Sequence, residues 1–348
     1  MCIRDRAEIA GVNVTDASHH AAFCDYDNDG DLDFYLLTNR LEDPNGSLAK
    51  LPVKFERPGV PSLLPGVEKY YGIWIVDADN WGVEPVGRPD YLFRNEGKDA
   101  DGHVKFTDVT SRTGISGRGD GLTCTWSDVD LDGDCDLYVC NDFQGEDRFY
   151  YNNGDGTFEN RIAESVPHTT WFSMGSNAGD LDNDGDFDLL IADMSATSHY
   201  KSKVTMGIMG GMELQRANTS NPPQYMRNTL MLNETDGMFR EAAFMAGLDS
   251  SDWTWSVKIN DFDADGWLDV YLTNGVPREM NHSDIKITQE MLVGKHMWEF
   301  FKEGKMRKEQ NLAFRNEGAK STLKFKDVSQ SWGLDHKRSQ LRCGDRRL

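Results

Sequence analysis

The chain has 348 residues, of which 38% are hydrophobic and 11% aromatic, which is enough apolar side chain to bury a sizeable core. Its formal net charge of −21 opposes binding to nucleic acids and to anionic membrane surfaces, and it suits a chain that collects cations. No apolar run approaches the roughly 20 residues of a membrane-spanning helix, so we expect no membrane span.

The first six residues, MCIRDR, match the translation of a transposon end that is common in sequencing libraries. We therefore treat residues 1–6 as a non-native scar and leave them out of the expected fold. An ordinary start of translation is the alternative. If these residues are a scar, the natural N-terminus and any signal peptide lie upstream.

An acidic nonapeptide, DYDNDGDLD, occupies residues 25–33 and returns three times, at 128–136, 180–188 and 261–269. The shared pattern is D-x-D-x-D-G-x-x-D. Each copy lies between segments rich in aromatic and β-branched residues, and it is followed at once by an apolar run. The sequence therefore predicts four repeats of strand, acidic loop and strand.

A second repeated element follows each acidic hairpin and contains an asparagine and a glycine turn. It reads YLFRNEG at 91–97, FYYNNGDGTF at 149–158, LMLNETDGMF at 230–239 and LAFRNEG at 312–318. This element predicts two further strands per unit, and four antiparallel strands make up a propeller blade. We expect an all-β fold, a β-propeller with units at about 7–110, 111–165, 166–247 and 248–334.

The number of blades follows from the spacing of the repeats. Asp128 and Asp180, the first loop aspartates of the second and third units, are 52 residues apart, and the longer units carry insertions. About four blades and a remnant then fit in residues 7–336, whereas propellers close with about 4–8 blades. We expect a fragment of a larger ring, with closure of four blades as the alternative. Residues 337–348 form an aberrant tail in which the next acidic loop does not appear, and a frameshift is one explanation.

Aspartates at positions 1, 3, 5 and 9 of a tight loop can converge on one cation, with the position-7 carbonyl as a further ligand. Hard oxygen ligands in this number suit Ca²⁺, whereas Mg²⁺ demands tighter geometry and Zn²⁺ prefers histidine or cysteine. We expect about four structural calcium ions. The predicted ligands, with the position-7 residue acting through its carbonyl, are Asp25, Asp27, Asp29, Asp31 and Asp33; Asp128, Asp130, Asp132, Asp134 and Asp136; Asp180, Asp182, Asp184, Asp186 and Asp188; and Asp261, Asp263, Asp265, Trp267 and Asp269.

The EF-hand is the obvious rival for an aspartate-rich calcium loop. It needs flanking helices and a bidentate glutamate at position 12. Position 12 of these loops is apolar in every copy: Leu36, Val139, Ile191 and Leu272. The pattern therefore favours a hairpin calcium loop, and a metal-free, solvated acidic turn is the remaining alternative.

The four acidic loops, with their strands and the LFRN-type segments, resemble the FG-GAP/VCBS repeats of integrin-α-like β-propellers over roughly residues 7–335. Among these the chain looks most like bacterial relatives of the cartilage acidic protein (ASPIC/UnbV) group. The resemblance implies an extracellular or surface protein with calcium-stabilised blades, usually seven, and an adhesive or unknown role. The C-terminal ASPIC/UnbV module of that group is not found in this sequence.

Four cysteines lie in the repeats, and no C-x-x-C motif is present. Cys124 and Cys140 are symmetric about the second acidic loop, so a regular hairpin places them opposite each other. A cross-strand disulfide and two buried free thiols are both open interpretations. Cys24 and Cys135 have no obvious partner in the sequence.

Three insertions are the most individual parts of the chain. Residues 41–90 contain Trp74 and Trp81, residues 195–228 contain SHYKSK and a methionine-rich run, and residues 275–311 contain a predicted helix. That helix, around Thr288–Lys302, has Met291, Leu292, Trp298 and Phe301 at helical spacing. Binding surfaces often lie on such loops, although the insertions can equally pack on the propeller.

Catalytic motifs are absent from the sequence, and His19, His20 and His199 are more simply read as structural. We therefore expect no enzyme. The favoured hypothesis is a secreted, periplasmic or cell-surface propeller that binds an extracellular protein or a glycan, and that continues into further blades. A lectin-like module, with Trp74 and Trp81 stacking on sugars, is the second hypothesis, and a polysaccharide-acting enzyme is the third.

Overall fold

The structure is a computed structural model of the chain. It describes residues 3–57, 59–75, 81–143, 145–204, 220–234, 237–276, 308–318 and 322–338, with scattered positions between 282 and 305. The methionine-rich run of the second insertion and residues 339–348 of the predicted tail lie outside the described residues.

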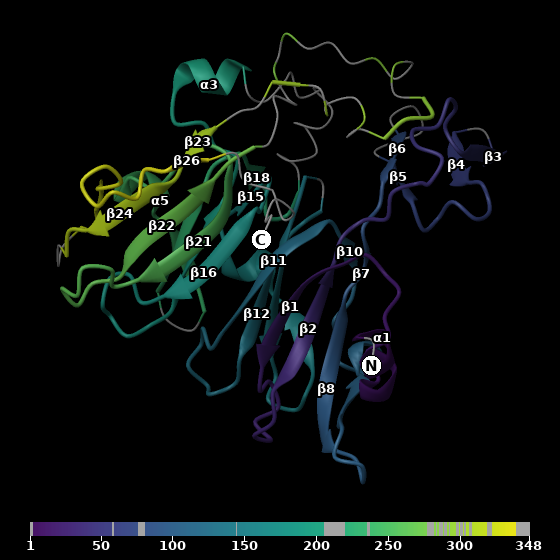
Figure 1. Cartoon of the computed structure of the whole chain (residues 1–348), viewed down its shortest axis with the longest axis horizontal. Helices are drawn as coiled ribbons and strands as arrows, with labels where there is room; N and C mark the ends of the chain where they lie inside the picture. The colour runs from purple at the N-terminus through teal and green to yellow at the C-terminus, as the bar shows by residue number, and fades with distance from the viewer. Residues whose placement is uncertain are drawn as a thin grey trace, which may run out of the picture.

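Four antiparallel, four-stranded sheets form the body of the molecule, and we call them blades 1 to 4 (Figure 1). Within each blade the strands follow one another in chain order, each paired with the next. Blade 1 contains β1 (Ser18–Cys24), β2 (Asp33–Thr38), β8 (Tyr91–Lys98) and β9 (Val104–Asp108); blade 2 contains β11 (Gly121–Ser127), β12 (Asp136–Asn141), β13 (Arg148–Asn152) and β14 (Phe158–Asn160). Blade 3 contains β16 (Gly175–Gly179), β17 (Asp188–Ala192), β19 (Thr229–Asn233) and β20 (Phe239–Glu241); blade 4 contains β21 (Thr254–Asn260), β22 (Asp269–Asn274), β24 (Leu312–Asn316) and β25 (Phe325–Asp327).

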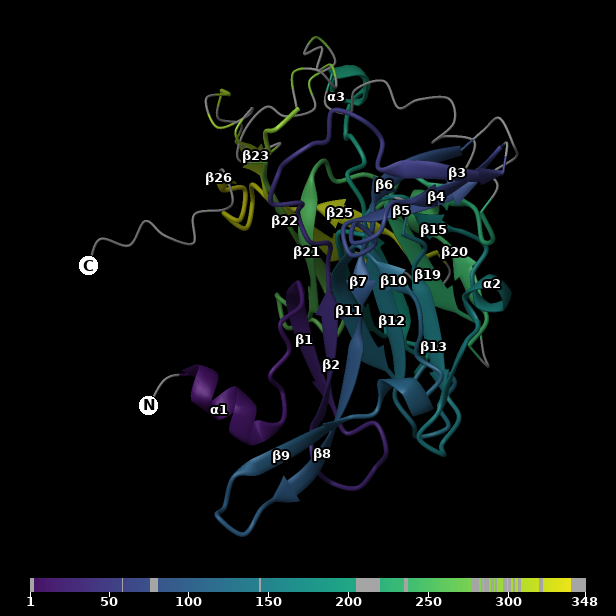
Figure 2. The same cartoon turned by 90° about the vertical axis from the view of Figure 1, so that its right-hand side faces the viewer.

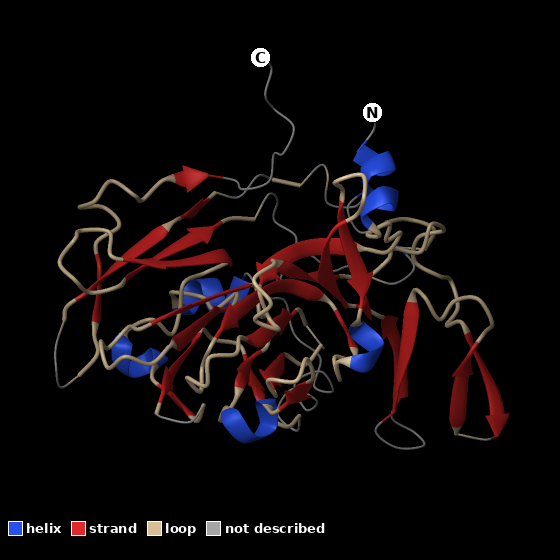
Figure 3. Cartoon of the chain, turned by 90° about the horizontal axis from the view of Figure 1, so that it is seen from below, coloured by secondary structure: helices blue, strands red, loops and turns tan. Residues whose placement is uncertain are grey.

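The first strands of successive blades lie against one another: β1 contacts β11, β11 contacts β16, and β16 contacts β21. Among the described residues β1 and β21 make no comparable contact, so the four blades form an arc and not a closed ring. Strands dominate and the helices are short, as the view from below shows (Figure 3). The predicted all-β, propeller-like fold is therefore confirmed.

Each interface between blades is an apolar layer that follows from the alternation of side chains along a strand. In β12, Leu137 and Val139 face blade 1 and pack in one cluster with Tyr35 and Leu92. The alternate residues of β12, Tyr138 and Cys140, face the other way and pack with Leu189, Ile191 and Met231 of blade 3. A third layer joins blades 3 and 4. Because a central blade is covered on both faces, every residue of its second strand is buried.

The predicted symmetry of Cys124 and Cys140 is wrong. Ser127 pairs with Asp136, so the register places Cys124 opposite Val139 and Cys140 opposite Thr123. The shift of one residue sends the two thiols to opposite faces of the sheet. Both are buried free thiols, one in the layer toward blade 1 and the other in the layer toward blade 3.

The two ends of the blades differ. At one end, which we call the acidic end, lie the loops that join the first and second strands. The second strand of each blade runs to the opposite end, which we call the insertion end because the three insertions begin there. The short strands outside the blades lie at the insertion end: β3 (Val53–Arg57), β4 (Val60–Leu63), β5 (Tyr71–Ile75), β6 (Trp81–Pro85), β7 (Arg88–Pro89), β10 (Arg118–Gly119), β15 (Thr169–Thr170), β18 (Gln224–Tyr225), β23 (Glu309–Gln310) and β26 (Lys337–Arg338). Figure 2 shows β3 to β6 and α3 (His199–Val204) at this end, and the β8–β9 hairpin at the other.

The remaining described helical elements are α1 (Ile3–Ala10), which contacts β9, and short turns at blade connections: η1 (Thr110–Arg112), α2 (Ile162–Ser165) and α5 (Ala243–Ala246). No described helix is long and apolar enough to cross a membrane. The helix predicted around Thr288–Lys302 is not continuous: Met291 and Glu299 are helical, but the described residues between them are not. Val293 forms a β-bridge with Ser47, and Gly294 has a φ of +70°, which ends a helix. Leu292, Trp298 and Phe301 lie outside the described residues.

Candidate metal sites

The four acidic loops share one backbone conformation. The residue at position 4 is left-handed in every copy, with φ of +57° to +60° at Asn28, Leu131, Asn183 and Ala264. The glycine at position 6 also has a positive φ, from +88° to +104°. Two positive-φ residues within three positions turn the chain tightly, which brings the aspartates of positions 1, 3 and 5 to one side.

The aspartates at positions 1 and 5 fold the loop around themselves. In the first loop Asp25 accepts hydrogen bonds from the backbone N–H groups of Asp29 and Gly30, both at 3.0 Å. Asp29 in turn accepts from the N–H of Asp31 at 2.9 Å. All three bonds recur in the third and fourth loops, and the bonds from the N–H groups of positions 6 and 7 recur in the second. The aspartates are thus held in place before any ion binds.

The aspartate at position 9 ties the loop to the third strand. Asp136 is buried, and its two oxygens accept from the N–H groups of Asn152 (2.8 Å) and Val129 (3.0 Å). Asp33, Asp188 and Asp269 make the equivalent pairs. Burial raises the pKa of Asp136 and Asp188 to about 7 and that of Asp33 to about 6, and it also raises the pKa of Asp269. A nearby cation would oppose this shift and keep the carboxylates ionised.

Position 3 carries the clearest sign of a missing positive charge. Within the described structure, one buried carboxylate oxygen of each of Asp27, Asp130 and Asp182 has no hydrogen-bond partner. Burial, and then the neighbouring aspartate at position 5, raises the pKa of all three. Leaving such oxygens buried and unpaired costs free energy, so native sites normally pair them or give them to an ion.

The carboxylates converge in each loop. Ligand oxygens within 4.8 Å of one another belong to Asp25, Asp27 and Asp29; Asp128, Asp130 and Asp136; Asp180, Asp182 and Asp188; and Asp261, Asp263 and Asp265. Calcium holds its oxygens at about 2.3–2.6 Å, so two ligands of one ion lie no more than about 5 Å apart. The residues present therefore fit one Ca²⁺ per loop. The predicted ligands Asp33, Asp132, Asp184 and Asp269 stand outside these groups. Ligation by the position-7 carbonyls, including that of Trp267, stays a prediction.

The fourth loop differs from the others in one contact. The guanidinium of Arg315 lies 2.6 Å from Asp263 and 2.7 Å from Asp265. Arg94, at the same place in blade 1, pairs instead with Glu96 at 2.7 Å. An arginine therefore already compensates part of the negative charge at the fourth loop.

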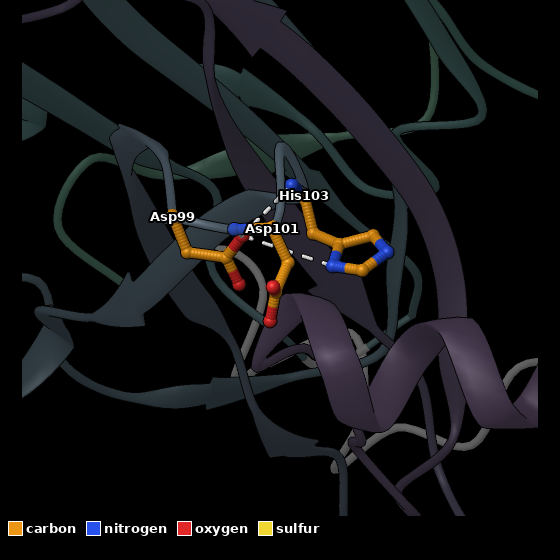
Figure 4. A group of neighbouring side chains, drawn as sticks. All are labelled: Asp99, Asp101 and His103. Atoms are coloured by element: carbon orange, nitrogen blue, oxygen red, sulfur yellow. Dashed lines mark hydrogen bonds and ion pairs between the residues drawn. The ribbon is translucent and has the colours of Figure 1, made fainter.

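A fifth group, Asp99, Asp101 and His103, lies in the β8–β9 hairpin (Figure 4). One oxygen of Asp99 accepts from the N–H groups of Asp101 (3.0 Å) and His103 (2.9 Å), and the other lies 3.2 Å from the ammonium of Lys105. Asp99 thus stabilises a turn and already has a cationic partner. We assign no metal to this group.

The sequence did not predict a role for one residue of the repeat, the asparagine of the second repeated element. The amide of Asn152 donates to the carbonyl oxygen of Cys135 in its own loop (3.3 Å) and to that of Tyr26 in the preceding loop (2.8 Å). Asn233 and Asn316 bridge the next two pairs of loops in the same way. The repeated asparagine therefore joins each candidate metal loop to its neighbour.

A second recurring polar residue lies at the insertion end, just before the third strand of each blade. It accepts a hydrogen bond from the end of the second strand, and we call this arrangement the bracket. Asp147, just before β13, accepts from the N–H of Asn141 and from the hydroxyl of Tyr138, both at 2.8 Å. Asp90 holds blade 1 in the same way, and Asn228 and Asn311 take this place in blades 3 and 4. Burial raises the pKa of Asp147 to about 7 and that of Asp90 to about 6.

No curated protein matches the sequence. Among solved structures, the chain is similar to an Agrocybe aegerita lectin described for specific recognition of non-reducing terminal N-acetylglucosamine, with TM-score 0.36 and 14% identity over 90% of this chain and 66% of that one. It is also similar to the Photorhabdus luminescens Tc holotoxin pore, with TM-score 0.29 and 17% identity over 85% of this chain and 12% of that one. The chain thus spans less than two thirds of either structure.

A family match covers the centre of the chain. Residues 128–191, from the first aspartate of the second acidic loop to the strand after the third, match the FG-GAP-like repeat. This segment includes two of the four candidate metal loops and all the strands between them, β12 to β16. Blades 2 and 3 therefore contain an FG-GAP-like repeat.

Proposed function

We propose that this chain is a calcium-stabilised segment of an extracellular β-propeller that serves as a binding module for a protein or a glycan. The observation that carries the proposal is the buried, unpartnered carboxylate oxygen at position 3 of the first three loops. The FG-GAP-like repeat supports it. The resemblance to the ASPIC/UnbV group adds the expectation of further blades and of a secreted, periplasmic or surface location.

Calcium in this proposal is structural. Bound at the acidic end, it would neutralise the repulsion among the aspartates and fix the loop that the repeated asparagine joins to the next blade. Calcium also keeps carboxylates ionised, so the loop aspartates would not serve as general acids. We therefore propose a binding role and not an enzymatic one.

Calcium titration of the chelated protein, followed by calorimetry, tests the metal. We expect about four sites with dissociation constants of roughly 10⁻⁴–10⁻³ M, the range of extracellular calcium modules. Magnesium is the control ion and should bind more weakly, because it demands a smaller octahedral shell. Absence of calcium binding by a folded, chelated protein would refute the proposal.

The ligand site we propose lies at the insertion end. A cavity of about 600 Å³ forms where the first insertion meets the described part of the third, with Tyr70, Tyr71 and His296 in its lining. The backbone of Ser47 is hydrogen-bonded to Lys295 (3.2 Å) and to Gly294 (2.9 Å), which holds the two insertions together. The volume of the cavity lies within the range of about 300–1,000 Å³ that is typical of small-ligand sites.

The lining of this cavity favours a glycan as the second, more specific candidate. It combines the tyrosines with acidic and basic side chains, including Arg40, Glu42 and Asp43, which can hydrogen-bond to hydroxyl groups. The aromatic residues suggested by the sequence serve less well. Trp74 packs over Gly82, and Trp81 lies edge-on against Phe55, with ring centroids 5.5 Å apart.

A glycan array separates a glycan ligand from a protein ligand. We expect the calcium-loaded protein to bind a subset of glycans and Tyr70→Ala to lose that binding. Phe55→Ala, which removes an exposed aromatic ring outside the cavity lining, should retain it. Binding that survives Tyr70→Ala, or an array without signal, would argue against the glycan and leave protein adhesion.

A further inference from the structure

Two cysteines that the sequence left without partners meet between blades 1 and 2. Cys24 is the last residue of β1 and directly precedes the first acidic loop, and Cys135 is position 8 of the second loop. The Cys135 thiol is the largest influence on the pKa of the Cys24 thiol, which it raises, and Cys24 lowers the pKa of Cys135, as expected for two side chains that lie close together across the blade interface. Both are only partly buried.

The repeat geometry explains why these positions meet. Cys24 occupies the place just before the loop, and the same place in blade 3 is Gly179. A β-carbon added to Gly179 would lie 3.0 Å from the Cδ1 of Leu268, which is position 8 of the fourth loop. The residue before one loop therefore faces position 8 of the next loop in two separate blade pairs. Blades 3 and 4 have a glycine–leucine contact there, and blades 1 and 2 have two thiols.

The backbone around the two thiols is fixed from both sides. The amide of Asn152 binds the carbonyl oxygens of Tyr26 and Cys135 together, as described above. The amide of Asn28 reaches from the first loop to the carboxylate of Asp134 at 2.6 Å. The segments that carry the two cysteines are thus held against each other by contacts that need no sulfur chemistry.

We propose that Cys24 and Cys135 form a disulfide that joins blade 1 covalently to blade 2. The oxidant is a small-molecule disulfide such as glutathione disulfide. One protein thiolate attacks it, forming a mixed disulfide and releasing one glutathione thiolate; the second protein thiolate then attacks the mixed disulfide and releases the other. The two thiol protons pass to the released thiolates, and the protein gives two electrons to the oxidant.

The remaining repeat cysteines make the pairing selective. Cys124 and Cys140 are buried in different apolar layers on opposite faces of blade 2. Neither can reach the other without a change of register, and a small oxidant has little access to them. Oxidation should therefore join Cys24 to Cys135 alone.

Peptide mapping tests the link directly. The sample is the calcium-loaded 348-residue chain with Cys2→Ser and Cys343→Ser, which remove the two terminal cysteines. Cleavage before aspartate places the four repeat cysteines in separate peptides: Asp16–Cys24, Asp120–Ser127, Asp134–Cys135 and Asp136–Asn141. After glutathione disulfide treatment and alkylation of free thiols, we expect the first and third peptides to be joined and the other two to be alkylated. Recovery of both Asp16–Cys24 and Asp134–Cys135 as alkylated, unlinked peptides from folded protein would overturn the proposal.

Melting provides a second readout. The crosslink closes a long loop, so we expect the oxidised protein to melt roughly 5 °C above the reduced one. Cys24→Ser should abolish this difference while melting close to the reduced parent protein, and Cys124→Ser should retain it. Equal melting of the oxidised and reduced parent would contradict a link that stabilises the blade pair, and a difference that persists in Cys24→Ser would assign it to other thiols.

Discussion

The acidic end and the insertion end of the same blades follow different rules. At the acidic end the four loops share their dihedral angles and most of their internal hydrogen bonds, and an asparagine joins each of the three pairs of neighbouring loops. At the insertion end the bracket before the third strand is aspartate in two blades and asparagine in two, and each connection differs in length. A loop whose carboxylates must converge on one ion tolerates little change of sequence. A position that needs only one acceptor for the N–H of the second strand can be either aspartate or asparagine.

Chelation of calcium should give the largest difference in stability between the two ends. Removing calcium leaves the loop aspartates uncompensated, so we expect the melting temperature to fall by on the order of 10 °C. Hydrogen exchange measured below that temperature should show lost protection of the Gly30 and Gly185 amides, with smaller changes in β5 and β6. Uniform loss of protection at both ends would contradict a local role for the ion.

The asparagine bridge offers the next largest effect. Asn233→Ala leaves the buried carbonyl of Val129 without its 2.6 Å donor and should cost about 2–3 kcal/mol of unfolding free energy. Asn95→Ala is the matched control: its amide donates to Leu32 of its own loop, and blade 1 has no preceding blade among the described residues. Denaturant unfolding measures both variants. Equal losses would show that the link between blades adds nothing to the bond within a blade.

The sequence predicts the recurring geometry of the acidic end well, and it predicts contacts between blades and between insertions poorly. The four acidic loops predicted the fold and the candidate ligands because each aspartate and glycine has a fixed geometric task that recurs. The Cys124–Cys140 pairing failed because symmetry in sequence placed the register one residue away from the Ser127–Asp136 pair that the loop imposes. The contact of Cys24 with Cys135 could not be predicted, because it depends on how two blades pack, and one unit's periodicity does not contain that information. The cavity at the insertion end joins two unrelated insertions, which is equally invisible in sequence.

A single substitution changes the bracket residue at the insertion end from aspartate to asparagine, or from asparagine to aspartate. Because the folded pKa of Asp147 is raised to about 7, the folded state binds a proton that the unfolded state releases, and this contribution to stability is lost as the pH rises through about 7. Asp147→Asn should remove that pH dependence, about 2–3 kcal/mol between about pH 5 and about pH 8. Asparagine fits, since Asn311 donates to the hydroxyl of Tyr271 in blade 4 at 2.8 Å.

Denaturant unfolding of wild type and Asp147→Asn across this pH range gives the difference directly, with the contributions of all other groups cancelling. The reverse change, Asn228→Asp in blade 3, should destabilise, and most at high pH, because a carboxylate cannot donate to the carbonyl of Leu248 as the amide does at 2.9 Å. Parallel pH profiles for wild type and Asp147→Asn would show that Asp147 stays ionised in the folded protein.

The smallest effect concerns the one loop that departs from the rule at the acidic end. Arg315 competes with a cation for Asp263 and Asp265, so Arg315→Gln should strengthen calcium binding at the fourth loop. The ion pair is exposed and screened by solvent, so the gain should be modest, about two- to fivefold in affinity. Arg94→Gln, which removes an arginine paired with Glu96, should leave the first loop nearly unchanged. Calcium titration is followed by tryptophan fluorescence, and the part of the signal that Trp267→Phe removes reports on the fourth loop, because Trp267 is its position 7. An unchanged affinity would mean that Arg315 turns away when the ion binds.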